Sequence, residues 1–122
     1  FGTAERLDPE ASRDIWHAVR DAAPLRGDGD VWRVHVRASL APDIVARAGA
    51  QASLLDWGGG LVWLRCTAGT DLRARLGAFD GHATRVRGVG PGAVQPEPAA
   101  LAALTDGIRA KFDPRGILSG AA

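Results

Sequence analysis

The chain has 122 residues, of which 46% are hydrophobic and 24% are charged, a composition typical of one ordinary globular domain. Its net charge of +1 excludes a broad electrostatic attraction to nucleic acid or to acidic lipid. Its single cysteine excludes an internal disulfide and a multi-cysteine metal site, and no apolar run approaches the ~20 residues that span a bilayer.

A first helix is predicted at 9–23, because Asp8 can cap its start and Pro9 suits the first helical position. The apolar residues that fall at helical spacing within it are Ile15, Val19 and Ala22. A proline and two glycines follow this segment and end the helix.

Residues 31–37 read VWRVHVR, and this alternation predicts a half-buried strand. One side of the strand is apolar, while the other carries Arg33, His35 and Arg37. Two interpretations of this cationic side stay open. It is a solvated face, or it recognises an anion such as a carboxylate through its guanidinium groups.

The rest of the chain predicts an alternation of helices and strands. The expected elements are a helix at 39–49, strands at 52–57 and 61–65, a helix at 70–79, a strand at 82–87, a Gly/Pro loop at 88–98 and a helix at 99–112. The core order is strand, helix, strand, strand, helix, strand. We therefore predict an α+β fold with a ferredoxin-like βαββαβ antiparallel sheet, plus N-terminal and C-terminal helices. Two helices should cover one face of the sheet and leave the other face free.

Three consecutive glycines at 58–60 lie between two apolar, tryptophan-bearing segments. A phosphate-binding glycine motif leads from a strand into a helix, whereas here a second strand follows. The run therefore predicts a hairpin turn, formed by Asp56, Gly58, Gly59 and Gly60.

Other candidate residues stand singly in the sequence. No two histidines have metal-binding spacing, so no metal site is predicted. Trp57 and Trp63 flank the hairpin, as packing anchors or as the lining of a cleft. His82 begins the last strand, where it is structural or faces a cleft, and Cys66 is expected to be a buried, inert thiol.

Three motifs together resemble a known family: LLDWGGGLVWL at 54–64, GHATR at 81–85 and FDPRGIL at 112–118. The chain resembles the C-terminal part of the FAD-binding subunits of bacterial glycolate oxidases (glycolate dehydrogenases). These belong to the FAD-linked oxidases with a vanillyl-alcohol-oxidase-type flavin domain. The similarity extends over about 16–118, and Trp32 and Arg33 match the family's first strand.

The resemblance implies that 31–122 is a cap or substrate domain, that 1–30 is an N-terminal helix and linker, and that the flavin domain is absent from this chain. Residue 1 is Phe rather than Met, which also leads us to expect part of a longer or processed protein. FAD would belong to the full-length subunit, and none is expected on this part alone. The implied partners are a second flavin subunit and an iron–sulfur subunit. The implied location is cytoplasmic, or peripheral at the inner membrane through the complex.

The implied reaction is oxidation of glycolate, a 2-hydroxy acid, to glyoxylate, with this part inactive by itself. Candidate residues facing substrate or flavin are Arg33, Trp57, Trp63, His82 and Arg85, with His82 the catalytic candidate. Two departures weaken the match: Val62 stands where relatives carry arginine, and residues 119–122 replace the family's NPGR tail. The alternative function is a non-enzymatic ferredoxin-like interaction or ligand-sensing module.

Overall fold

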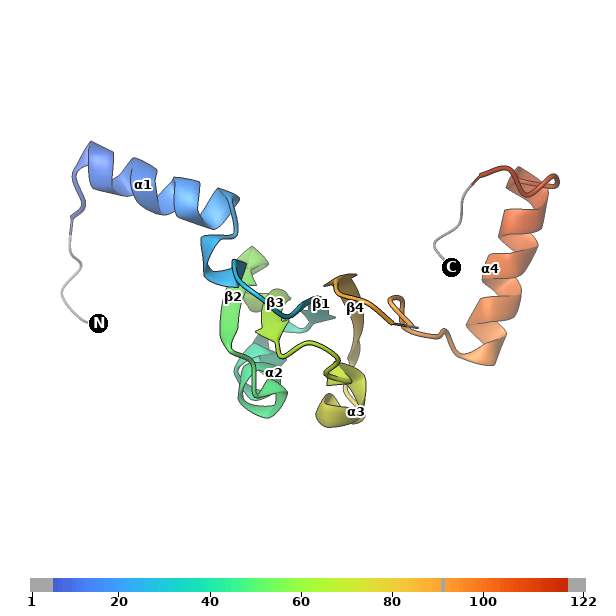
Figure 1. Cartoon of the computed structure of the whole chain (residues 1–122). Coiled ribbons are helices and arrows are strands. Elements are labelled where there is room, and N and C mark those ends of the chain that lie inside the picture. Colours follow the sequence, from blue (N-terminus) through green and yellow to red (C-terminus); the bar gives the residue numbers. More distant parts are fainter. Residues whose placement is uncertain (1–5, 91, 119–122) are drawn as a thin grey trace.

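A computed structural model of the chain describes residues 6–90 and 92–118 (Figure 1). The departure expected at 119–122 lies outside these residues. The helices are α1 (Pro9–Arg20), α2 (Ala41–Ala48), α3 (Leu72–Leu76) and α4 (Ala99–Phe112), and the strands are β1 (Asp30–Val36), β2 (Ala52–Asp56), β3 (Leu61–Cys66) and β4 (Gly81–Arg87). Short 3-10 turns, η1 (Ala23–Leu25), η2 (Ala38–Leu40) and η3 (Trp57–Gly59), connect some of them.

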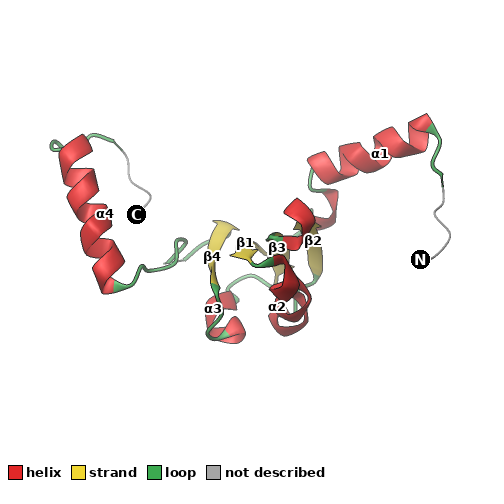
Figure 2. Cartoon of the chain, turned by 180° about the vertical axis from the view of Figure 1, so that it is seen from behind, coloured by secondary structure: helices red, strands yellow, loops and turns green. Residues whose placement is uncertain are grey.

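The four strands form one antiparallel sheet in the order β2-β3-β1-β4. This order and the connections through α2 and α3 are those of the ferredoxin-like split βαβ arrangement, so the predicted fold is confirmed. Both α2 and α3 lie against the same face of the sheet, whereas α1 and α4 extend away on the other side (Figure 2).

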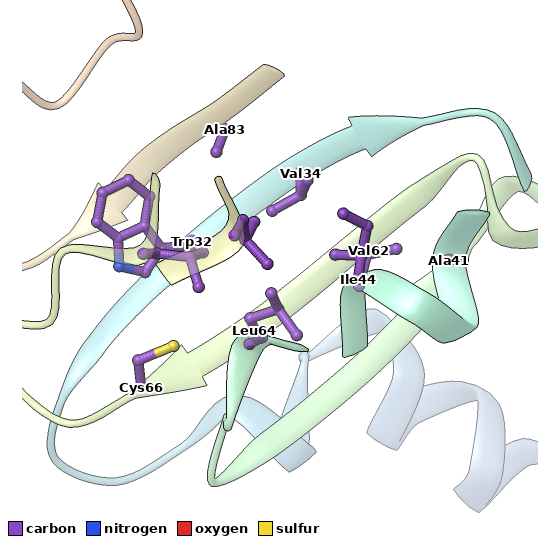
Figure 3. Close-up of a cluster of buried hydrophobic side chains, with 11 residues drawn as sticks. Trp32, Val34, Ala41, Ile44, Val62, Leu64, Cys66 and Ala83 are labelled. Atoms are coloured by element: carbon purple, nitrogen blue, oxygen red, sulfur yellow. The ribbon is translucent and has the colours of Figure 1, made fainter. Parts of the chain in front are cut away.

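The core lies between the sheet and these two helices, and period-two alternation in the strands supplies one side of it. Its buried members are Trp32, Val34, Ala41, Ile44, Ala48, Val62, Leu64, Cys66, Leu72, Leu76 and Ala83 (Figure 3). In α2 the buried residues recur at helical spacing, which places one stripe of that helix on the sheet. Cys66 is buried as predicted, and burial raises the pKa of its thiol.

Three helices are shorter than the sequence predicts. α2 covers Ala41–Ala48 rather than 39–49, because the 3-10 turn η2 precedes it. α1 ends at Arg20 rather than at 23, because Ala22 takes a left-handed backbone conformation (φ 48°) before η1. α3 covers only Leu72–Leu76, and the residue that caps it is Asp71, whose side chain accepts a hydrogen bond from the Ala74 amide. α3 then ends at Gly77, whose φ of 63° is not helical. Glycine adopts this conformation without the steric cost that a side chain would bring.

The glycine run lies in the hairpin between β2 and β3, as predicted, and not at the start of a helix. The Asp56 carboxylate accepts a 2.7 Å hydrogen bond from the Trp57 amide, which holds the start of the loop. Gly58 and Gly59 both have positive φ, at 62° and 98°. The chain can therefore reverse direction in four residues and return as β3.

Candidate functional site

The face of the sheet opposite α2 and α3, here called the open face, carries three rows of side chains. Residues that pair across neighbouring antiparallel strands point to the same side. From one end of β1 to the other, the rows are Ala52, Arg65, Val31 and Arg87; then Leu54, Trp63, Arg33 and Thr84; then Asp56, Leu61, His35 and His82.

The first row is partly covered by the chain itself, so the open face is free only in part. Leu25 of η1 is buried at 5% exposure, and a cavity of about 220 Å³ remains between η1 and the floor formed by Val31 and Trp63. Arg87 fixes this segment by donating hydrogen bonds to the carbonyls of Leu25 and Gly27, at 3.2 and 2.7 Å. The segment expected to be a linker therefore folds back over the first row and reaches Trp63 of the second, whereas Arg33 and His35 are half-buried and His82 is exposed.

The third row brings two histidines together. The rings of His35 and His82 stack with centroids 4.7 Å apart and planes 14° from parallel. The Trp57 indole contacts His35 edge-on at 5.8 Å, although Trp57 itself is 70% exposed at the hairpin. Burial, with smaller repulsive effects of His82 and Arg33, lowers the pKa of His35 below its ordinary 6.5. His35 is therefore neutral at pH 7 and can act as a hydrogen-bond acceptor or base.

Arg33 occupies the middle of the second row, directly opposite Trp63 on one side and Thr84 on the other. Its Nε is buried without a hydrogen-bond partner, and within the described part of the chain no carboxylate pairs with its guanidinium. The Nε of Arg65 is also buried without a partner, but its Nη1 donates to the Asp28 carbonyl and to Gln51 Oε1. A guanidinium without a counter-ion beside an accessible face can bind an anionic group.

Arg85 lies on the other face, apart from the remaining site candidates. It pairs with Trp32, and its guanidinium carbon lies 5.7 Å from the centre of that buried ring. The register shifts between Val31 and Trp32, so β4 carries one extra residue there and Arg87 returns to the open face. The structure thus places Arg33, Trp63 and His82 on the same open face, in neighbouring rows, and Trp57 beside His35 at its edge, whereas Arg85 lies on the opposite face.

Arg37, which is predicted to share one side of the first strand with Arg33 and His35, lies outside the candidate site. It follows the end of β1 and forms an exposed ion pair with Asp80, at 3.2 Å. His35, which the sequence placed on this side without assigning it to a site, is instead central. The alternation of His35 with Arg33 in the sequence indicates that both lie on one side of the strand. The stacking of His35 on His82 depends on how β1 pairs with β4, which the sequence does not display.

The described residues provide no site for a metal or for the phosphates of a dinucleotide. No group of three or more His, Cys, Asp or Glu side chains converges anywhere in 6–90 and 92–118. The glycine run connects two strands, so its amides do not lead into a helix that could hold a pyrophosphate. The glycine run therefore does not fit the phosphate-bearing part of FAD.

Comparison with known proteins gives one significant relative. Over 113 residues the chain is 33% identical to the glycolate oxidase subunit GlcE of Escherichia coli (strain K12). The chain is similar to a glycolate oxidase subunit. The alignment covers 90% of this chain but only 31% of GlcE, so the chain spans about a third of that relative's length. No protein-family model and no solved structure matches the chain.

The helices of the described residues are also too short or too polar to cross a bilayer.

Proposed function

We propose that this chain is the cap domain of a FAD-dependent glycolate oxidase subunit, with its open face toward a flavin held by a separate domain. The observation that carries the proposal is the similarity to GlcE over 90% of this chain. The motifs GHATR and DWGGG lie within the sheet and hairpin that build the open face, so the resemblance and the candidate site fall on the same elements.

The exposed sides of the outer helices support a position inside a larger assembly. α1 leaves Trp16 66% exposed and Ile15 48% exposed, and α4 leaves Leu104 and Phe112 at 61% and 81%. Both helices extend on the same side as the open face (Figures 1 and 2). Contiguous exposed apolar surfaces mark sites of interaction with another molecule. A flavin domain seated between α1 and α4 would cover both helices and meet the open face.

The residues of the second and third rows can each supply one part of the handling of a 2-hydroxy acid. Arg33 binds the substrate carboxylate through paired N–H donors, since its guanidinium lacks a counter-ion in the described chain. His82 accepts the proton of the substrate hydroxyl, and the neutral ring of His35 stacked on it positions His82. Glycolate becomes glyoxylate by losing this proton and a hydride, and the flavin of the full subunit would take the hydride.

The test is to express the chain alone and joined to the flavin domain of a full-length subunit, assembled with the second flavin subunit and the iron–sulfur subunit. We expect the isolated chain to be colourless and inactive, and the joined form to be yellow and to oxidise glycolate. In the assembled enzyme, Arg33→Ala should raise the KM for glycolate about tenfold or more, as expected for the loss of a charge-assisted hydrogen bond.

Arg37→Ala is the matched control, because Arg37 directly follows the same strand but forms an exposed ion pair with Asp80. Unchanged kinetics of Arg33→Ala would remove Arg33 from the substrate site. An isolated chain that purified with bound flavin would contradict the proposed division into domains.

A further inference from the structure

A groove of about 470 Å³ runs along the outer edge of β4, beyond the residues considered above. His82 and Thr84 form one wall, and the segment that leads into α4 forms the other with Val94, Pro98 and Leu101. This volume lies within the ~300–1,000 Å³ of typical small-molecule sites. The groove is large enough to hold a ligand or a substantial part of one.

Hydrogen bonds hold the outer wall of the groove in place against β4. The Arg85 amide donates to the Ala93 carbonyl at 2.8 Å, and the Ala83 amide donates to Gln95 Oε1 at 2.9 Å. Arg73, beneath the sheet, donates a further 2.8 Å bond to the Ala93 carbonyl. The wall is therefore tied to the strand at several points, and the groove exists before any ligand binds.

The groove continues into the open face, because its β4 wall belongs to both. Thr84 pairs directly with Arg33, and His82 stacks on His35. Arg85 bonds to Ala93 and Ala83 bonds to Gln95, so this segment runs antiparallel to β4. Glu97 therefore lies toward the Gly81 end of the groove and away from Thr84. An anion is therefore favoured at the Thr84 end, beside Arg33, while most of the remaining wall is apolar.

We propose that this groove binds the alkyl side chain of a 2-hydroxy acid longer than glycolate, whose carboxylate lies beside Arg33 and Thr84. This inference rests on the proposed function, which accounts for binding of the carboxylate and hydroxyl groups. It adds the kind of side chain that the substrate carries. Glycolate has no side chain and would leave the apolar walls formed by Val94, Pro98 and Leu101 in contact with water. An unbranched alkyl chain would cover these walls and displace that water.

The test measures binding of glycolate, 2-hydroxybutyrate and 2-hydroxyhexanoate to the 122-residue chain, by amide chemical-shift titration. We expect affinity to rise about fourfold for each added methylene, the value for full burial of a CH₂ group. The shifts should centre on His82, Thr84 and Leu101. Arg33→Ala should weaken all three acids by a similar factor and leave the dependence on chain length intact.

Leu101→Trp fills the groove and should abolish the gain with chain length. Leu104→Trp is the matched control, since Leu104 is another exposed leucine of α4 and does not line this groove. The proposal is overturned if affinity does not depend on chain length, if Leu101→Trp retains the dependence, or if none of the acids binds. Any of these results leaves the proposed function standing, because that function is judged by flavin colour and glycolate turnover in the joined protein.

Discussion

Trp57 begins the β2–β3 hairpin loop with a positive φ of 52°, which L-residues other than Asn and Asp rarely adopt. This conformation turns the indole toward His35 at the edge of the candidate site. A Cβ in left-handed backbone costs about 1–2 kcal/mol, whereas glycine escapes this cost. The residue therefore offers a direct test of the hairpin geometry on which the site depends.

We expect Trp57→Gly to be more stable than Trp57→Ala. Trp57 is 70% exposed, so both variants lose the same covered part of the side chain, worth roughly 2 kcal/mol for ~75 Å². Glycine then gains about 1–2 kcal/mol of relieved strain and loses about 0.5–1 kcal/mol of backbone entropy. The difference is about 0–1.5 kcal/mol in favour of Trp57→Gly, centred near ~0.75 kcal/mol, or a melting temperature higher by roughly 3–4 °C at that centre.

Urea unfolding followed by circular dichroism measures this difference without relying on tryptophan fluorescence. The same two substitutions at Leu55 are the control, because Leu55 is also exposed but lies in extended β2. At position 55 the alanine variant should be more stable than the glycine variant by about 0.5–1 kcal/mol, which is the usual order in a strand. If alanine were equal to or better than glycine at position 57 as well, the left-handed start of the loop would be wrong, and with it the placement of Trp57 against His35.

Three further outcomes follow from burial and charge. Ile44→Ala should lower the free energy of unfolding by about 2–5 kcal/mol in urea titrations, since Ile44 is fully buried, whereas Ile15→Ala, at 48% exposure on α1, should cost under about 1 kcal/mol. The unfolded state binds a proton to His35 more readily than the folded state, because folding lowers its pKa. Stability should therefore fall as the pH drops below 6.5 toward the folded pKa, and His35→Asn should reduce this loss in parallel titrations at pH 5 and 7. Cys66 should resist alkylation by iodoacetamide at pH 7.5 in the native protein and react rapidly in urea; fast native labelling would show that the core opens there.

Local pattern in the sequence was enough to predict the elements and the fold. The alternation of Trp32, Val34 and Val36 sets which side of β1 is buried, and the helix at 99–112 begins and ends where the sequence predicts. The glycine run predicts the hairpin because few other residues allow its backbone angles. These features depend on neighbours in the chain, which a single sequence displays directly.

The composition of the candidate site depended on contacts between distant segments. The register of β1 with β4 stacks His35 on His82, and the extra residue near the end of β4 turns Arg87 to the open side, whereas simple alternation from His82 already places Arg85 toward the helices. The return of η1 over the first row and the groove beside β4 likewise bring together residues far apart in the chain. A one-residue change of register reverses the face of every following side chain. Strand periodicity can therefore show which residues share a side of one strand, but only the pairing of strands decides which of them meet.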